Sequence, residues 1–202
     1  MGDADDADDG GARMRALIGE ASWEWPDGPW LRVTMVSSAD GAATGSDGLS
    51  GSINNEADAA VFSALREGAD AVVVGAGTAR AEGYGPAGKP LIVIGHALPD
   101  SLEGADGVRL VEGGEAEDLR SLVAGLRAEG LDSLLCEGGP SLLGTLLKAG
   151  LVDELCLTFT PRIVSGDGRR IVTGAPLDVP LTLTALVEAD STLIGRWLVS
   201  SA

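Results

Sequence analysis

The amino-acid sequence predicts an α/β fold with a mainly parallel sheet, helices on both faces and an antiparallel edge. Segments typical of strands alternate with segments typical of helices over the first three quarters of the chain, and strands follow strands after that. The unbroken apolar run at residues 71–74 indicates a strand that is buried on both faces, as in a parallel sheet. Two strand-like segments on either side of Ala189-Asp190-Ser191 predict a closing antiparallel hairpin.

Caps and stop residues delimit the individual elements. Asn54 or Asn55 is expected to cap a helix that ends near Glu67, because an asparagine side chain accepts a hydrogen bond from the first helical turn. Residues 75–80 are expected to form a glycine-rich turn, and residues 153–160 a strand of alternating polarity. The expected helices cover residues 14–21, 55–67, 117–129 and 140 to about 150, and the expected strands residues 31–36, 70–74, 90–94, 108–111, 134–136, 153–160, 181–186 and 192–199.

The length of 202 residues suits one domain with a substantial core. Residues 1–13, rich in Asp, Ala and Gly, are expected to form a disordered acidic tail, and residues 14–202 the folded domain. An acidic start is unlike a secretory signal, and no apolar run approaches the roughly 20 residues needed to cross a bilayer. We therefore expect a soluble, cytoplasmic protein that does not bind membranes.

The charge and the scarcity of cysteine and histidine exclude several kinds of site. With 31 acidic against 14 basic residues, the net charge is −17, which argues against a nucleic-acid-binding surface. The two cysteines, Cys136 and Cys156, both lie in apolar runs and suggest neither a disulfide framework nor a metal cluster. The single histidine, His96, lies in an expected turn and is interpreted as a surface residue, so no metal site is expected.

The stretch at residues 134–143 carries the clearest sign of a ligand. A buried strand runs into Gly138 and Gly139, and a helix then opens with Pro140, which is well tolerated in the first helical turn. Glycines let a ligand approach the main chain, and the N–H groups of a helix start favour a phosphate. An ordinary tight connection between strand and helix is an equally good interpretation of this stretch alone.

Three loops follow the carboxyl ends of expected parallel strands, where α/β sheets bind their ligands. These are residues 37–52, 75–85 and 137–141. Neither the G-x-G-x-x-G dinucleotide pattern nor a phosphate-binding loop ending in Gly-Lys-Ser/Thr is present. The residues alone therefore predict an α/β domain with a nucleotide or phosphate ligand.

Four motifs occur in a characteristic order: Ser-Ser-Ala-Asp-Gly at residues 37–41, Leu-Arg at 65–66, Val-Gly-Ala-Gly-Thr at 74–78 and Glu-Gly-Gly-Pro-Ser-Leu at 137–142. In this order they resemble the C-terminal reductase domain of bacterial bifunctional riboflavin-biosynthesis proteins, over about residues 31–200. The Arg-Ile-Val-Thr-Gly sequence at residues 170–174 resembles the stand-alone members found in actinobacteria. The zinc deaminase half of the bifunctional proteins has no counterpart, since its His-x-Glu and Pro-Cys-x-x-Cys motifs are missing.

The resemblance implies a three-layer α/β/α fold like that of dihydrofolate reductase, and a homodimer. It also implies NADPH-dependent reduction of 5-amino-6-(5-phosphoribosylamino)uracil by direct hydride transfer, without a metal. Catalytic roles would fall on Asp40 and Glu137, and substrate contacts on Thr34, Ser50 and Arg66. The residues expected to bind NADPH are Ser37, Gly75, Gly77, Thr78, Glu82, Gly138, Gly139, Pro140, Ser141 and Leu142.

One departure from the family leaves the substrate open. The family carries a lysine on the first strand, six residues before the Asp of its Ser-x-Asp-Gly motif, and this chain has Thr34 there. Without that cation, a pterin such as dihydrofolate is an alternative substrate. A nucleotide- or flavin-binding protein without turnover is a second alternative.

Several of these residues also have plainer interpretations. Arg66 could be a solvated residue that complements the helix dipole, Asp40 a turn former, and Glu137 a charge at a helix start. The tryptophans at residues 23–30 could wall a planar ligand, although packing on the body is the preferred interpretation. The cations available for a phosphate are Arg66, Arg80, Arg162, Arg169 and Arg170.

Overall fold

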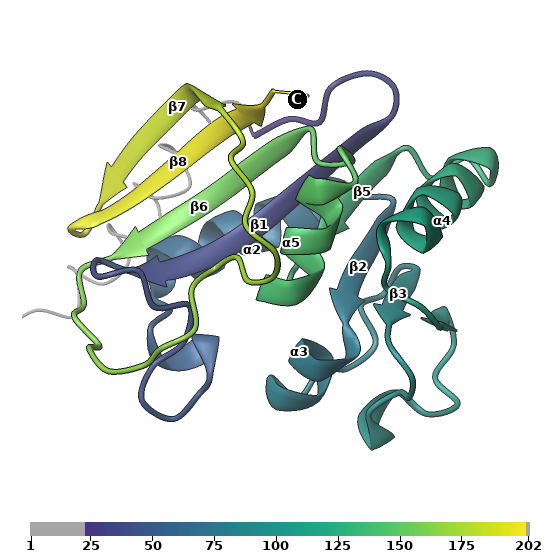
Figure 1. The fold of residues 1–202 in the computed structure, drawn as a ribbon, viewed down its shortest axis with the longest axis horizontal. Coiled ribbons are helices and arrows are strands. Elements are labelled where there is room, and N and C mark those ends of the chain that lie inside the picture. The colour runs from purple at the N-terminus through teal and green to yellow at the C-terminus, as the bar shows by residue number, and fades with distance from the viewer. Residues whose placement is uncertain (1–22, 201–202) are drawn as a thin grey trace, which may run out of the picture.

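The computed structural model describes residues 23–200, which form one eight-stranded mixed sheet with helices on both faces (Figure 1). The acidic tail and the helix expected at residues 14–21 lie outside the described residues. The strand order is β4-β3-β2-β5-β1-β6-β8-β7. The strands are β1 (Trp30–Ser38), β2 (Ala71–Gly75), β3 (Leu91–Ile94), β4 (Val108–Val111), β5 (Ser133–Cys136), β6 (Glu154–Thr160), β7 (Leu181–Ala189) and β8 (Thr192–Val199).

The first six strands in chain order are parallel, and the last two close the sheet as an antiparallel hairpin. Strand β1 lies between β5 and β6 and pairs in parallel with both, whereas β8 pairs antiparallel with β6 and with β7. The predicted α/β class, the parallel sheet and its antiparallel edge are thereby confirmed.

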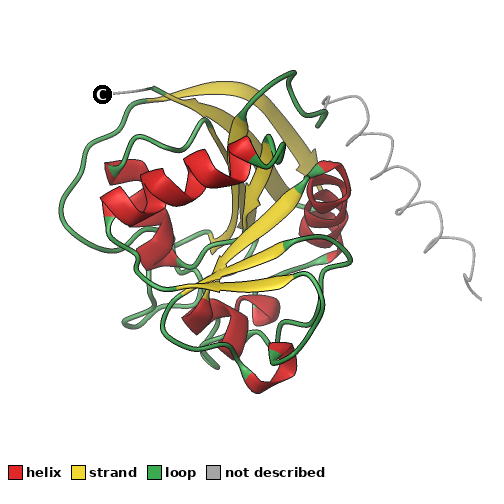
Figure 2. Ribbon diagram, turned by 90° about the vertical axis from the view of Figure 1, so that its right-hand side faces the viewer, coloured by secondary structure: helices red, strands yellow, loops and turns green. Residues whose placement is uncertain are grey.

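Helices pack on both faces of the sheet (Figure 2). Helices α4 (Ala116–Ala128) and α5 (Pro140–Lys148) pack their leucines and valines against one face, in a core that includes Leu134 and Cys136. Helices α2 (Glu56–Gly68) and α3 (Ala76–Ala81) cover the other face, where α2 packs on Leu135 and Cys156. Two short 3₁₀ helices, η1 (Ser50–Ser52) and η2 (Asp100–Leu102), lie in the loops.

Two local predictions are wrong. The glycine-rich segment after β2 is the helix α3 rather than a turn, because the chain turns into its first helical residue directly at Gly75. Strand β6 is buried along almost its whole length rather than alternating, since it lies between β1 and β8 and has its core positions on both faces.

The tryptophan segment packs on the body of the protein, as the preferred interpretation expects. The Trp25 indole N–H donates to the Leu65 carbonyl at 3.3 Å, and the Trp30 indole N–H donates to Glu154 at 3.1 Å. Trp25 also covers the guanidinium of Arg32, whose carbon lies 4.5 Å from the ring centroid. Arg32 and Glu154 are fully buried and form an ion pair, with Arg32 Nη2 2.9 Å from Glu154 Oε2. The tryptophans thus cover an internal ion pair that the sequence did not indicate.

Candidate functional site

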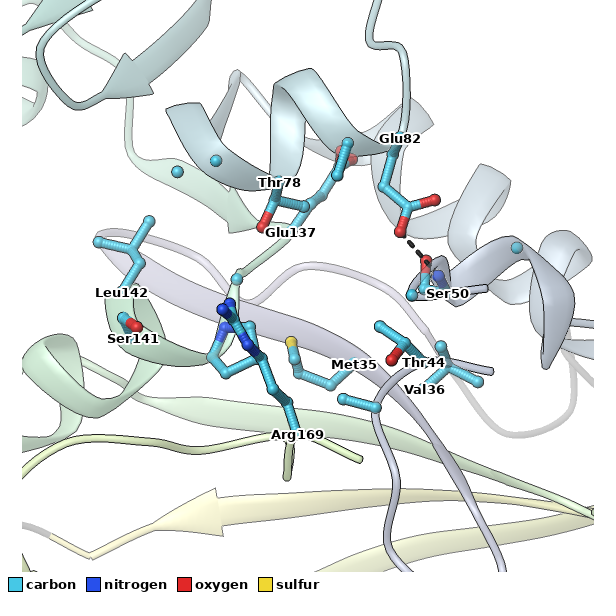
Figure 3. Close-up of a pocket in the computed structure, with 18 of the residues that line it drawn as sticks. Met35, Val36, Thr44, Ser50, Thr78, Glu82, Glu137, Ser141, Leu142 and Arg169 are labelled. Carbon is cyan, nitrogen blue, oxygen red and sulfur yellow. Dashed lines mark hydrogen bonds between the residues drawn. The ribbon is translucent and has the colours of Figure 1, made fainter. Parts of the chain in front are cut away.

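The carboxyl ends of β1, β2 and β5 open into one cavity of about 1210 Å³. The strand order places these three ends side by side, so the loops that follow them meet, as expected for an open α/β sheet. Residues of α2 and of the loop after β6 complete the wall. Figure 3 shows the cavity with Met35, Thr78, Glu137 and Arg169 around it.

Two glycine turns, Gly75 at the junction of β2 with α3 and Gly138-Gly139 at the junction of β5 with α5, touch one another at the wall of this cavity. The Gly75 N–H donates to the Gly138 carbonyl at 2.8 Å, which ties the end of β2 to the end of β5. A Cβ on Gly139 would lie 2.2 Å from Thr78 Oγ1, and Gly138 has a φ of +83°. A Cβ on Gly138 would lie 2.9 Å from the Met35 sulfur, so neither position accepts a larger side chain without displacing its neighbours.

Helix α5 begins at this point, with Gly139 as its N-cap and Pro140 in the first turn. The first N–H groups of a helix have no partner within the helix and favour an anion. Of the residues expected to bind NADPH, the structure brings Gly75, Gly77, Thr78, Glu82, Gly139, Pro140, Ser141 and Leu142 to the cavity wall. Gly138 contributes its carbonyl to the turn-to-turn contact.

Glu137 is the centre of a polar cluster beside the glycine turns. Arg66 donates to both of its carboxylate oxygens, from Nε at 2.8 Å and from Nη2 at 2.7 Å. The Tyr84 hydroxyl donates to Oε2 of the same carboxylate at 2.8 Å. The Arg66 guanidinium also lies over the rings of Phe62 and Tyr84, at 4.9 and 5.7 Å from their centroids. Arg66 is therefore not a simple solvated residue at a helix end.

No motif in the sequence marks Tyr84 as a site residue, although it is the only tyrosine in the chain and follows Gly77-Thr78 closely. Its burial and the neighbouring Glu137 carboxylate raise the pKa of the Tyr84 hydroxyl, so it stays protonated and donates to Glu137. The hydrogen bonds fix the Glu137 carboxylate at the cavity wall as an acceptor for ligand hydroxyl or N–H groups.

Asp40 lies outside the large cavity, in contrast to the catalytic position that the resemblance implied. Its carboxylate accepts hydrogen bonds from the Ser38 hydroxyl and from the backbone N–H groups of Val164 and Ser165. These bonds, the one from Ser38 foremost, lower the pKa of Asp40 to about 2. Asp40 thus joins the loop after β1 to the loop after β6 and borders a smaller hollow of about 260 Å³.

Ser37 is also displaced from its expected role. It is buried, and its hydroxyl donates to the Ser38 carbonyl at 2.9 Å instead of lining the cavity. Its neighbours on β1, Thr34, Met35 and Val36, line the cavity in its place. Side chains alternate between the two faces of a strand, but consecutive residues near a strand end can both reach a cavity that opens there.

Ser50 and Glu82 contact each other at the cavity wall. The Ser50 backbone N–H donates to Glu82 Oε1 at 2.7 Å, a contact drawn in Figure 3. The carboxylate at the end of α3 therefore fastens the Gly- and Ser-rich loop that follows β1. Both residues line the cavity, as expected, but Glu82 already has a partner within the protein.

A second carboxylate, Asp58, was not singled out from the sequence. It lies in the first turn of α2, three residues after the N-cap Asn55, where acidic residues are common for purely local reasons. In the structure Asp58 is buried and lines the cavity, and burial raises its pKa despite a hydrogen bond with Thr158. Nearby, Asn54 Oδ1 is buried without a hydrogen-bond partner among the described residues. Two acceptors thus line the same side of the cavity and suit N–H donors on a ligand.

No metal site or membrane span is found within residues 23–200. Their His, Cys, Asp and Glu side chains form no group of three or more that could hold a metal ion. None of their helices is both long and apolar enough to cross a membrane.

Ionisation of Asp58 should cost stability, because the raised pKa means that the folded protein holds this proton more tightly than the unfolded chain. The free energy of unfolding should fall as the pH rises from the ordinary value of 3.8 through the raised folded pKa. Asp58→Asn abolishes this titration, so the variant should gain stability relative to the wild type across that window. Urea unfolding followed by circular dichroism, between about pH 4 and about pH 8, measures the difference.

Asp47→Asn is the control of opposite sign. Hydrogen bonds from the Leu49 N–H and the Ser52 hydroxyl lower the pKa of the exposed Asp47 below its ordinary value of 3.8. This variant should therefore lose stability relative to the wild type as the pH rises through the range below that value, so its unfolding is measured down to about pH 2. A difference between Asp58→Asn and the wild type that does not change with pH would contradict the assignment.

Comparisons with known proteins agree with the fold and the order of the motifs. The model of the RibD C-terminal domain matches residues 29–195. The 2,5-diamino-6-ribosylamino-4(3H)-pyrimidinone 5′-phosphate reductase of Methanothermobacter thermautotrophicus is 34% identical over 91 residues, which are 45% of this chain and 42% of that protein. The match thus spans less than half the length of this curated relative.

Solved structures extend the likeness to the whole fold. A pyrimidine reductase-like protein from Corynebacterium diphtheriae has a TM-score of 0.78 at 23% identity, covering 91% of this chain and 98% of that chain. A dihydrofolate reductase from Enterococcus faecalis complexed with NADP(H) has a TM-score of 0.55 at 17% identity, covering 84% of this chain and 96% of that chain. The expected dihydrofolate-reductase-like fold is confirmed, and the family match over most of its length shows that the chain belongs to the RibD C-terminal domain family.

Proposed function

We propose that this chain is a cytoplasmic NADPH-dependent reductase of riboflavin biosynthesis that acts on a ribosylaminopyrimidine phosphate. The observation that carries the proposal is the position of Glu137, directly before the Gly138-Gly139 turn and within one cavity with it. A carboxylate that can bind substrate and a turn that can bind a phosphate therefore adjoin one another. The name of the Methanothermobacter relative, a pyrimidinone 5′-phosphate reductase, supports the same substrate class.

The cavity suits a dinucleotide. Its volume of about 1210 Å³ is large enough for a cofactor and a substrate together. Thr78 packs so closely on Gly139 that a Cβ does not fit there, which keeps the two glycine turns together. The start of α5, beside these turns, supplies N–H donors for a phosphate. The residues that would hold NADPH are those of the two glycine turns, the start of α5 and α3.

When bound, NADPH would supply a hydride for the imine or opened-sugar carbon of the substrate. Glu137 would accept hydrogen bonds from ribose hydroxyl groups, while Arg66 and Tyr84 hold its carboxylate in one orientation. Met35 and Val36 line the cavity beside them and would keep water from the reacting carbon.

A pterin such as dihydrofolate is the second candidate substrate. Thr34 favours it, and Asp58 is compatible with it. Thr34 stands on β1 where the resembling family has a lysine, and it is buried at the cavity wall. Asp58 presents a buried carboxyl group to the same cavity, which suits the N–H groups of a pterin or of a pyrimidinone ring.

Oxidation of NADPH by the purified protein separates these candidates. With 5-amino-6-(5-phosphoribosylamino)uracil as substrate, we expect a loss of NADPH absorbance that requires both protein and pyrimidine. Dihydrofolate should support little or no oxidation. Oxidation with dihydrofolate alone would favour the pterin, and tight cofactor binding without turnover of either compound would favour a binding protein.

The contact between the two glycine turns gives a prediction for the cofactor. In Gly139→Ala the new Cβ would meet Thr78 Oγ1 at 2.2 Å and push the turns apart, so NADPH should bind about tenfold more weakly, or about 1.4 kcal/mol. In the double variant with Thr78→Ala, the nearest Thr78 atom is Cβ at 3.6 Å, which is ordinary contact.

The double variant should therefore lose less NADPH binding free energy than the sum of the losses in the two single variants. Titration calorimetry on both single variants and on the double variant completes the cycle. Strictly additive losses would argue against a shared cofactor site at these turns.

We further propose a homodimer that forms through the outer face of the β7–β8 hairpin. Four leucines on this face remain substantially exposed: Leu181 (44%), Leu183 (50%), Leu186 (55%) and Leu193 (42%). The strand register places Leu183 opposite Trp197 and Leu186 opposite Gly195, so the four side chains share one face. A largely apolar face of this kind, with Glu188 opposite Leu193, is typical of an interface between subunits.

Leu183→Glu should convert the dimer to a monomer, because it places a charge in the middle of this face. Size-exclusion chromatography with light scattering measures the mass. Leu198→Glu is the matched control, since Leu198 is similarly exposed on β8 but faces the other side of the sheet. A wild-type protein that is monomeric, or a dimer that persists in Leu183→Glu, would contradict the proposed interface.

A further inference from the structure

Among the described residues that line the large cavity, two carry a permanent positive charge, Arg66 and Arg169. Arg66 is committed to Glu137 through two hydrogen bonds and lies against two aromatic rings. The guanidinium of Arg169 has no hydrogen-bond or ion-pair partner within residues 23–200, and Figure 3 shows it extending into the cavity. Arg169 is thus the cation that remains available to a ligand there.

The main chain that carries Arg169 is held in place. Its carbonyl accepts a hydrogen bond from the Ala43 N–H at 2.7 Å, and the Asp40 carboxylate binds the N–H groups of Val164 and Ser165 in the same loop. A Cβ on Gly168 would lie 3.0 Å from Ala42 Cβ, so the two loops pack closely at this point. The loop after β6 therefore presents the Arg169 side chain from a fixed base, which reduces the entropy lost when it binds a ligand.

The charges around Arg169 explain why a phosphorylated ligand needs it. Four carboxylates line the cavity, those of Asp58, Glu82, Glu137 and Asp167, and the whole chain has a net charge of −17. A phosphomonoester with nearly two negative charges would be repelled by this surface without a local cation. Thr34, at the position of the family lysine, offers none.

We propose that Arg169, on the loop after β6, binds the phosphomonoester group of a ligand in this cavity. This inference rests on the proposed function, which names two sources of such a group: the 2′-phosphate of NADPH and the 5′-phosphate of the ribosylaminopyrimidine. A guanidinium suits either one, because it can donate two parallel hydrogen bonds to phosphate oxygens.

The test is the binding of matched ligand pairs to Arg169→Gln, measured by titration calorimetry. NADP⁺ and NAD⁺ differ in the 2′-phosphate, and the phosphorylated pyrimidine and its dephosphorylated form differ in the 5′-phosphate. We expect one phosphorylated ligand to lose about tenfold or more in affinity, while its unphosphorylated partner changes by less than about twofold. The pair that responds identifies which phosphate Arg169 binds.

Arg170→Gln is the matched control. Arg170 borders the smaller hollow beside Asp40 rather than the large cavity, so its loss removes the same charge from the neighbouring position. Ligand affinities of this control should stay within about twofold of the wild type, and equal melting temperatures of the two variants would show that the fold is intact.

The outcomes separate this inference from the proposed function. If Arg169→Gln weakens both members of each pair equally, or weakens no ligand, Arg169 does not bind a phosphate although the reductase assignment stands. If the wild-type protein binds neither NADP⁺ nor the phosphorylated pyrimidine, the proposed function fails and this inference fails with it. Since binding is the readout, neither result depends on turnover.

Discussion

The contact between the ends of β2 and β5 is the constraint on which the rest of the site depends. The hydrogen bond from the Gly75 N–H to the Gly138 carbonyl holds two loops within one cavity, although 62 residues separate them. Glycine is required there because Thr78 and Met35 leave no room for a Cβ at Gly139 and Gly138. The same turn starts α5 and positions Glu137, so the backbone geometry sets both halves of the site.

The electrostatics of the cavity follow from that arrangement. Glu137 is buried, and it is held in place by Arg66 and Tyr84, whose hydrogen bonds offset the loss of its hydration. Asp58 is buried with weaker support and so lowers stability when it ionises. A carboxyl group kept at such a cost in a ligand cavity is typical of a functional group rather than of a structural one. Arg169 opposes this negative charge from the loop after β6.

Much of the fold could be predicted from the sequence, because its signals are local. Apolar runs and the cap at Asn55 place most elements within a few residues. Burial of β6 on both faces could not be predicted from the segment, since it depends on the pairing of β8 with β6. The partners of Glu137 come from α2 and from the segment after α3, and only the folded sheet brings them together. From the sequence, Asp58 resembles an ordinary acidic residue at a helix start. The order of the motifs does not show where a side chain points, so it could not show that Asp40 lies outside the large cavity.

Transfer of a label from the cofactor to the substrate tests the central claim most directly. NADPH that carries deuterium on the reactive face of the C4 carbon of its nicotinamide is incubated with the protein and 5-amino-6-(5-phosphoribosylamino)uracil, and the product is analysed by mass spectrometry and NMR. Direct hydride transfer predicts one deuterium in the ribityl product when one of the two C4-labelled epimers of NADPH is used. The deuterium should lie on the ribityl carbon that stays bonded to the exocyclic nitrogen. A reduced product that lacks the label with either epimer, or oxidation of NADPH without reduction of the pyrimidine, would contradict the account.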